Sequence, residues 1–114
     1  LKAVQTLCGE QDERFETWFD ALDYMYEQAL NIDFDVAIIG CGAYGMPLAS
    51  KLKNAGKQAI HLGGATQLLF GIKGYRWEEQ YPTKIASFFN DAWIRPLTEE
   101  TPRNAGTVEK KCYW

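Results

Sequence analysis

The chain has 114 residues, of which 46% are hydrophobic and 24% charged, a composition typical of a globular domain with a buried core. The net charge of −3 and a pI of about 5.1 argue against a nucleic-acid-binding protein, which normally needs a broad basic surface. No apolar run is long enough for a transmembrane helix, and the three cysteines and one histidine lack the spacing of a zinc site. We therefore expect a soluble protein with reduced thiols, as in the cytoplasm.

The charges are distributed unevenly along the chain. Residues 1–35 contain nine acidic and two basic residues, whereas residues 36–77 contain five basic residues and no acidic one. A segment without acidic residues can raise the local concentration of an anionic ligand. In the alternative interpretation, Lys51, Lys53 and Lys57 form only the solvated face of one helix.

The first half of the chain predicts a strand, a helix and a second strand. Residues 1–7, LKAVQTL, alternate weakly between apolar and polar side chains and predict a strand. Residues 13–31 predict the clearest helix, because their apolar side chains recur at the spacing of one helix face and their acidic side chains fall elsewhere. Residues 35–40, DVAIIG, form a short apolar run that is typical of a strand covered on both faces of a parallel sheet.

A second helix and a third strand follow. The helix is expected from about Tyr44, with Pro47 in its first turn and Gly56 as its C-terminal stop. Residues 58–63, QAIHLG, then resemble the preceding buried strand. Strands that alternate with helices indicate parallel pairing with right-handed connections.

The rest of the chain has weaker signals. Residues 65–70 predict one or two helical turns, residues 71–77 a loop, residues 82–93 a short helix that begins near Thr83, and residues 96–114 an irregular tail. The whole order predicts one α/β domain with a Rossmann-like, three-layer arrangement, in which a short parallel sheet of about three strands is flanked by helices. We expect this domain to be a piece of a longer protein.

A glycine-rich turn stands between the second predicted strand and the helix that follows it. Its glycines have the G-x-G-x-x-G spacing that brings backbone N–H groups close to a phosphate at the start of a helix. The candidate phosphate or nucleotide contacts in this turn are Gly40, Gly42, Ala43, Tyr44 and Gly45. In the alternative interpretation, the glycines serve only the close packing of helix against strand.

The dinucleotide version of this motif also has an acidic residue at the end of the next strand, about 20 residues further on, which binds the ribose hydroxyls. Ile60, His61 and Leu62 occupy that place, and no acidic residue occurs before Glu78. This argues against NAD or FAD as the ligand. An NAD(P)-binding oxidoreductase domain therefore stands only as a third alternative.

A second glycine turn, HLGGATQ, follows the next predicted strand. In open parallel sheets, ligands bind beyond the carboxyl ends of the strands, so the two turns are expected to border one crevice. Gly63, Gly64, Thr66 and Gln67 are further candidate ligand contacts. His61 is the candidate catalytic group, as a base or as a hydrogen-bond donor to phosphate. In the alternative interpretation, His61 only has a structural role at the end of the strand, with its hydrogen bonds satisfied there.

A third candidate region, GIKGYRWEE, combines flexible glycines, two cations and two aromatic residues. We expect Lys73 and Arg76 to contact phosphate and Trp77 or Tyr75 to stack on a flat ring. The alternative is a surface loop that Trp77 anchors. We predict no metal ligands in this chain.

Four stretches, IIGCGAYGMPLA, HLGGATQLLFGIKGYRW, WIRP and the terminal CYW, resemble the C-terminal part of a group of uncharacterised bacterial proteins that occur with polysaccharide-biosynthesis enzymes. The resemblance covers nearly the whole chain. These proteins are in turn distantly similar to glycosyltransferases of the GT-D type, which have a Rossmann-like fold, use a sugar nucleotide and a divalent metal, and carry a D-x-E motif. Neither DFD at 33–35 nor DER at 12–14 matches that motif.

The resemblance implies the phosphate-binding half of a glycosyltransferase-like protein of bacterial surface polysaccharide synthesis. Its substrate would be a nucleotide or sugar nucleotide, and the divalent metal would be bound outside this chain, in an N-terminal domain that carries the D-x-E motif. The runner-up is a non-catalytic Rossmann-like binding or oligomerisation module. Because a short parallel sheet leaves its edge strands open, such a module would pair with itself or with that N-terminal domain.

Overall fold

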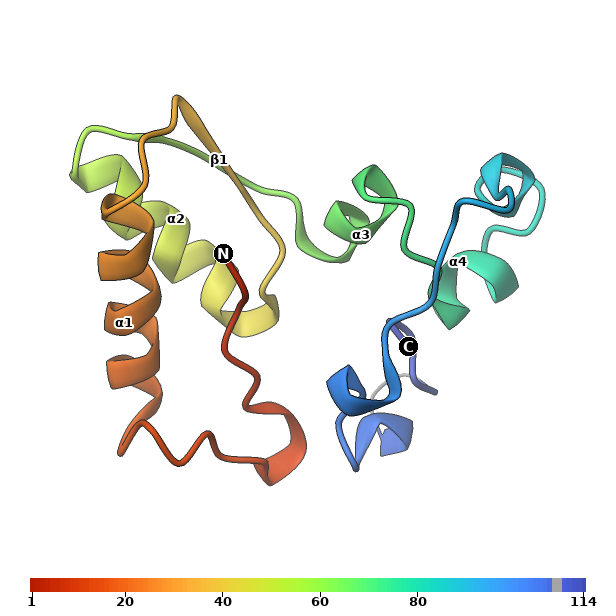
Figure 1. The fold of residues 1–114 in the computed structure, drawn as a ribbon, viewed down its shortest axis with the longest axis horizontal. Helices are drawn as coiled ribbons and strands as arrows, with labels where there is room; N and C mark the ends of the chain where they lie inside the picture. Colours follow the sequence, from red (N-terminus) through yellow and green to blue (C-terminus); the bar gives the residue numbers. More distant parts are fainter. Residues whose placement is uncertain (108–109) are drawn as a thin grey trace. The chain divides into compact units, whose positions relative to one another are not determined.

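The computed structural model describes residues 1–107 and 110–114. These residues form two compact units, the first made of Leu1–Thr6 and Gln11–Thr66, the second of Leu7–Glu10 and Gln67–Trp114. Figure 1 gives the course of the chain and the labels of its helices and strands. The first unit contains a two-stranded parallel sheet with helices, which confirms the α/β class predicted from the sequence.

Helix α1 (Trp18–Leu30) begins later than the apolar periodicity indicates. Thr17 and Asp20 form a capping box, in which the Asp20 amide donates to the Thr17 hydroxyl at 3.2 Å and the Thr17 amide donates to the Asp20 carboxylate at 2.8 Å. This exchange satisfies backbone amides that the helix itself cannot bond, and so it fixes the first residue of the helix. The buried face of α1 consists of Ala21, Leu22, Met25 and Ala29.

The two predicted buried strands are confirmed as β1 (Val36–Ile39) and β2 (Gln58–His61). They pair in parallel, with Val36 opposite Gln58 and Ile39 opposite His61. Helix α2 (Gly45–Asn54) connects them and carries Pro47 in its first turn, as expected. The connection therefore places the carboxyl ends of both strands at the same edge of the sheet.

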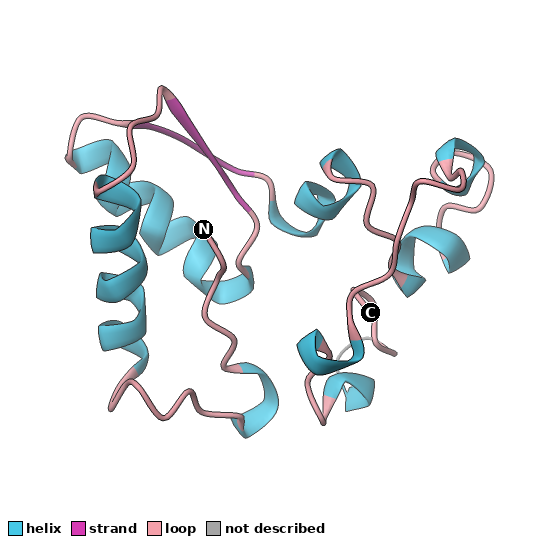
Figure 2. Cartoon of the chain, in the orientation of Figure 1, coloured by secondary structure: helices cyan, strands magenta, loops and turns pink. Residues whose placement is uncertain are grey.

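Helices cover one face of this sheet. In Figures 1 and 2, α1 and α2 lie on the same side of the strands. The side chains of Ala37, Ile39 and Ala59 belong to the core between strands and helices. The alternate side chains point away from it and are between 41% and 53% exposed: Val36, Ile38 and Ile60. The first unit thus has two layers, and the expected three-layer arrangement is not confirmed.

The strand predicted over residues 1–7 is wrong. Leu1–Thr6 has no regular secondary structure, and the chain then enters a 3₁₀ helix at Leu7–Gly9. Val4 is buried, and its amide donates to the Met25 sulfur at 3.4 Å instead of to a neighbouring strand. Within this segment only Val4 belongs to the core with α1, and the described residues form a sheet of two strands where about three were expected.

The second unit contains short elements only. The predicted helical turns are confirmed as α3 (Thr66–Leu69), but the predicted loop ends at Gly74, where α4 (Tyr75–Glu79) begins. The helix expected near Thr83 is reduced to a 3₁₀ turn, Ala86–Phe88. The expected irregular tail contains two more 3₁₀ turns, Thr98–Glu100 and Ala105–Thr107. Ile72 and Ile94 form an isolated parallel bridge.

Two cysteines are described as free thiols: Cys41, which is half-buried, and Cys112, which is buried. The side chain of Cys8, the third thiol expected to be reduced, lies outside the described part. Within the residues that the structure describes, no helix has the length and apolar character needed to span a membrane.

The two methionines provide a test of the core of the first unit. Met25 is 1% exposed, whereas Met46 is 67% exposed. We expect Met25→Ala to lower the free energy of unfolding by about 2–5 kcal/mol, because it leaves a cavity in the core, and Met46→Ala to change it by less than about 0.5 kcal/mol. Urea unfolding followed by far-UV circular dichroism measures both changes. Equal midpoints for the two variants would contradict this description of the core.

Candidate functional site

The two glycine turns meet at the carboxyl edge of the sheet. Gly40 directly follows β1, and Thr66 belongs to the turn that follows β2. A Cβ atom added to Gly40 would clash with the Thr66 side chain and would lie 2.8 Å from the carbonyl oxygen of Gly63. The two glycine turns are therefore in direct contact at this edge, and the crevice expected between them stays a prediction.

The glycines of the first turn have two different roles. A Cβ atom on Gly45, in the first turn of α2, would overlap the imidazole ring of His61. Gly40 is thus required for close packing, because Thr66 and the Gly63 carbonyl group occupy the space beside its Cα atom, and a side chain at Gly45 would force the His61 ring to move. The packing alternative explains these two positions.

Gly42 and Gly63 are not explained by packing. Both have positive φ, at +53° and +61°, which favours glycine at these positions. A Cβ atom on Gly42 would have no described atom within 4 Å, and one on Gly63 would approach only His61 Nε2, at 4.0 Å. These two glycines therefore leave open space next to their backbone, which a ligand needs.

Two buried polar atoms at this edge have no hydrogen-bond partner in the described part of the chain. They are His61 Nδ1 and Thr66 Oγ1. An unsatisfied buried donor or acceptor costs about 1–3 kcal/mol, so such atoms are rare unless a water, an ion or a ligand completes them. Both atoms lie beside the packing glycines, and we define Gly42, Gly63, His61 and Thr66 as the edge site.

Tyr44 and Cys41 contribute no reactive group to the edge site. The ring of Tyr44 is buried and stacks on Trp18 at a centroid distance of 4.5 Å, and its hydroxyl is hydrogen-bonded to Thr6. Only the backbone of Tyr44 can serve the predicted ligand contact, whereas the neighbouring Ala43 is exposed. Burial raises the pKa of the Cys41 thiol, which disfavours a reactive thiolate.

The lysines of the acid-free segment lie away from the edge site. Lys51 and Lys53 stand in the last turn of α2, roughly 9–12 Å along the helix from Gly45 at 1.5 Å per residue. Lys51 pairs with Asp23 at 2.5 Å, and the Lys57 ammonium lies 5.0 Å from the ring centroid of Phe34. These contacts favour the alternative that the lysines form a solvated face.

Four further candidate contacts, Gln67, Lys73, Arg76 and Trp77, lie in the second unit, whereas Gly64 lies in the first. The Trp77 indole donates to the Gln67 side-chain oxygen at 2.9 Å, and the Gln67 amide group donates to the carbonyl oxygen of Lys73 at 3.3 Å. The Lys73 ammonium lies 5.8 Å from the Phe89 ring centroid. Gln67 and Trp77 therefore organise the segment around α4.

Sequence reasoning did not assign a role to the C-terminal residues of this cluster. Arg76 donates through Nη1 to the Tyr113 hydroxyl at 3.0 Å, and its guanidinium lies 4.9 Å from the Tyr113 ring centroid. The conspicuous ending CYW was the available signal, but a contact between residues 37 positions apart cannot be read from composition or periodicity.

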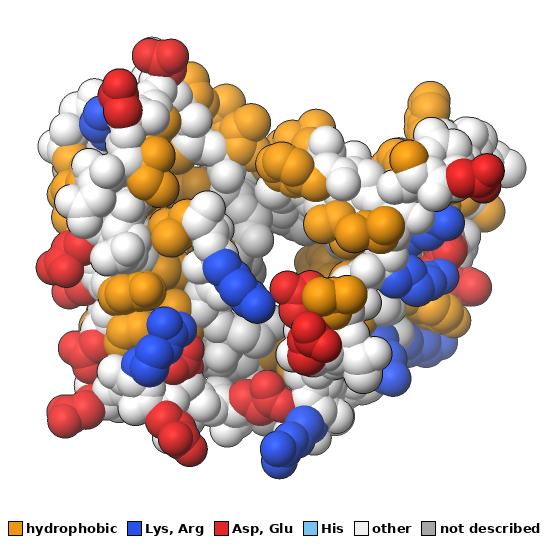
Figure 3. All heavy atoms as spheres, viewed as in Figure 1, with side chains coloured by type: hydrophobic (Ala, Val, Ile, Leu, Met, Phe, Trp, Pro, Cys, Tyr) orange, Lys and Arg blue, Asp and Glu red, His pale blue; other side chains and the backbone are white. Residues whose placement is uncertain are grey.

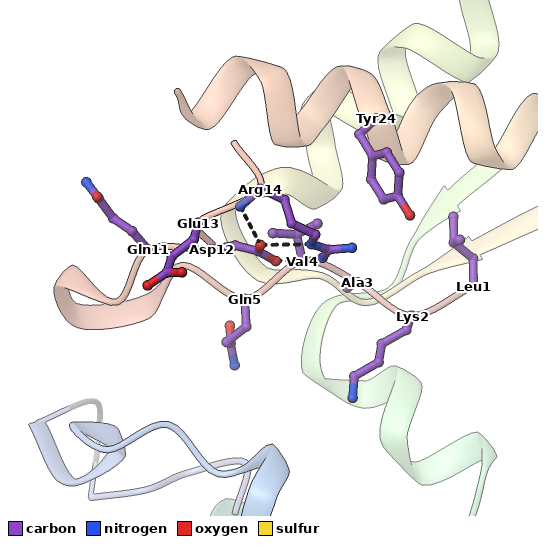
Figure 4. Close-up of a pocket in the computed structure, with 10 residues that line it drawn as sticks. All are labelled: Leu1, Lys2, Ala3, Val4, Gln5, Gln11, Asp12, Glu13, Arg14 and Tyr24. Carbon is purple, nitrogen blue, oxygen red and sulfur yellow. Dashed lines mark hydrogen bonds and ion pairs between the residues drawn. The ribbon is translucent and has the colours of Figure 1, made fainter. Parts of the chain in front are cut away.

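A separate recess lies in the first unit, between the N-terminal segment and the start of α1 (Figure 4). Its volume is about 650 Å³, and Asp12 and Arg14 form a two-pronged ion pair at its wall, with distances of 2.8 and 2.6 Å. The hydrogen bonds from Arg14 hold the pKa of the Asp12 carboxyl below its ordinary value. None of the predicted site residues lines this recess, and its paired charges give it no preference for an anion.

Across residues 1–107 and 110–114, no three His, Cys, Asp or Glu side chains are grouped closely enough to hold a metal ion.

The chain was compared with protein-family models, curated proteins and solved structures, and none of them matches it.

The contact of Gly45 with His61 can be tested with a double-mutant cycle. We expect Gly45→Ala to lower the free energy of unfolding by about 2–3 kcal/mol, because the new methyl group displaces the imidazole ring. In a His61→Ala background the same change should cost less than about 1 kcal/mol. Urea unfolding of the four chains measures the difference.

Gly42→Ala is the matched control for this cycle. It should cost about 1 kcal/mol for the backbone alone, since its φ is positive but its surroundings are open, and this cost should be the same with or without His61. A Gly45→Ala cost that is independent of His61 would show that the ring does not pack on this glycine.

Proposed function

We propose that the edge site binds the phosphate groups of a nucleotide or sugar nucleotide. The observation that carries this proposal is the pair of buried, unsatisfied atoms, His61 Nδ1 and Thr66 Oγ1, between two glycine turns that meet at the carboxyl edge of a parallel sheet. In open α/β sheets this edge is where ligands bind. A bound oxyanion would supply hydrogen-bond partners where the chain offers none.

The electrostatics of the edge site favour an anion. Helix α2 has ten residues and begins at Gly45, so its first amides direct partial positive charge toward the turn. No acidic residue occurs between positions 36 and 77 to oppose a phosphate. His61 stands at the end of β2, where dinucleotide-binding domains have an acid for the ribose hydroxyls. A phosphate is therefore the better ligand than a ribose diol.

In the resemblance to glycosyltransferases, this site would hold the diphosphate of the donor. Glycosyl transfer requires stabilisation of the departing diphosphate, and fixed amide dipoles and hydroxyl donors provide it without reorganisation. Thr66 and the turn amides would bind this group, and His61 is the residue placed to exchange a proton with it. The proposal includes a Rossmann-like, three-layer protein in which another layer covers the outer face of β1 and β2.

Ligand titration by nuclear magnetic resonance tests this proposal. We expect UDP-glucose to shift the amide signals of Gly42, Gly63 and Thr66, and uridine, which lacks phosphate, to leave them unchanged. Thr66→Val should weaken UDP-glucose binding about fivefold to tenfold, because it removes one hydroxyl and keeps the shape. Thr83→Val, at an exposed turn, is the matched control and should bind as the unmodified chain does. Unchanged amide signals at millimolar UDP-glucose would contradict the proposal.

A second candidate function, assembly through the sheet, is favoured by one observation. Val36, Ile38 and Ile60 form an uncharged apolar face that is 41–53% exposed, and apolar side chains reach the surface near the strands in Figure 3. Parallel sheets are normally covered on both faces. This face would then be covered by another copy or by another part of the parent protein.

Sedimentation at several protein concentrations tests assembly. We expect the average mass to rise with concentration and Ile38→Lys to abolish the rise, because a buried ammonium would be unpaired in the interface. Leu97→Lys, at an exposed position of the second unit, is the matched control and should behave as the unmodified chain. A constant monomer mass up to the highest concentration would refute self-assembly.

A further inference from the structure

The last three residues, Cys112–Trp114, form what we call the C-terminal strap, and the strap is bonded to the segment around α4. The Arg76 amide donates to the Cys112 carbonyl oxygen at 3.0 Å, and the Gln67 side chain donates to the Tyr113 carbonyl oxygen at 3.4 Å. The Arg76 guanidinium adds its hydrogen bond and ring contact with Tyr113. Backbone and side chain of the strap are thus held at separate points.

Gly74 leaves room for the strap to approach the segment around α4. A Cβ atom on Gly74 would lie 3.0 Å from the Cys112 carbonyl oxygen and 2.9 Å from Gln67 Nε2, so a side chain at this position would push the strap or the Gln67 side chain away. Cys112 is 1% exposed, and burial raises the pKa of its thiol. The closed strap therefore protects a thiol and engages a cation of the predicted phosphate loop, Arg76.

The backbone immediately before the strap is strained. Lys110 and Lys111 have φ of 56° and 63°, and they are the non-glycine residues with positive φ in the described chain. Such conformations are unfavourable for residues with a side chain, and they persist where surrounding contacts compensate for them. Here the compensating contacts are those of the strap with Gln67 and Arg76. The strained backbone of Lys110 and Lys111, which we call the hinge, favours release of the strap, and the hydrogen bonds of Tyr113 favour its bound position.

We infer that the C-terminal strap is a latch, which opens as a unit while the rest of the second unit stays folded. Opening relieves the left-handed backbone at Lys110 and Lys111, separates Arg76 from Tyr113 and exposes the Cys112 thiol. Closing restores the hydrogen bonds. The latch thereby controls whether Tyr113 contacts the Arg76 guanidinium.

Thiol labelling measures the open state directly. In a chain with Cys8→Ser and Cys41→Ser, Cys112 is the single thiol, and its rate of reaction with an aromatic disulfide reagent reports its exposure. We expect this rate to depend on urea much less steeply than global unfolding does, because a local opening exposes little surface. A rate with the full urea dependence of global unfolding would overturn the latch.

Substitutions in the strap and in its hinge should move the rate in opposite directions. Tyr113→Phe removes the hydrogen bond to a charged group and should accelerate labelling about tenfold. Lys111→Gly relieves the strain and should slow it about threefold. Lys84→Gly, the same replacement at an exposed turn without positive φ, is the control and should leave the rate unchanged. An unchanged rate in Tyr113→Phe, or a faster one in Lys111→Gly, would overturn the inference.

Hydrogen exchange in the unmodified chain provides a measurement that needs no substitution. The Arg76 amide donates to the Cys112 carbonyl oxygen, whereas the Lys73 amide donates to the Ile94 carbonyl oxygen at 2.7 Å, which does not belong to the strap. If the strap is a latch, the Arg76 amide exchanges through a local opening with a weaker urea dependence than the Lys73 amide. Equal urea dependence for the two amides would contradict it.

Discussion

The parallel pairing of β1 and β2 is the constraint on which the candidate site depends. Ile39 lies opposite His61, and the Leu62 amide donates to the Ile39 carbonyl oxygen at 2.9 Å, so the pairing extends to the end of both strands. Because the strands run in the same direction, the chain leaves both of them at one edge. Two glycine turns that are about 20 residues apart in sequence are thereby brought into contact. An antiparallel pair would have separated them by the length of the sheet.

The glycines of the two turns have two different structural roles. At Gly40 and Gly45 the space of a side chain is taken by Thr66 and His61. Gly42 and Gly63 instead have left-handed backbone with open space beside it. Close packing and ligand binding are therefore compatible explanations of one motif. The packing also buries polar atoms of Thr66 and His61 without partners, and this local cost is what a phosphate would remove.

The second unit has a different organisation, in which few regular hydrogen bonds are available and side chains replace them. Gln67 bonds the indole of Trp77, the carbonyl oxygen of Lys73 and that of Tyr113, so one amide group connects α3, α4 and the C-terminal strap. A residue predicted as a ligand contact thus acts as a structural centre. Short helices need such contacts, because a helix of one or two turns is not stable by itself.

The sequence by itself determined the elements whose signal is local. The apolar spacing of α1, the β-branched run of β1, the proline and glycine limits of α2 and the G-x-G-x-x-G turn are all properties of neighbouring residues, and each predicted its element. The tertiary structure alone decided the rest. The segment at 1–7 has the pattern of a strand, but its Val4 side chain belongs to the core with α1 and its Val4 amide donates to the Met25 sulfur. The absence of acidic residues from 36 to 77 favours an anion-binding site, but Lys51 forms an ion pair with Asp23 in the last turn of α2. Contacts such as Gly45 with His61, or Arg76 with Tyr113, depend on where distant segments meet, and no local pattern carries that information.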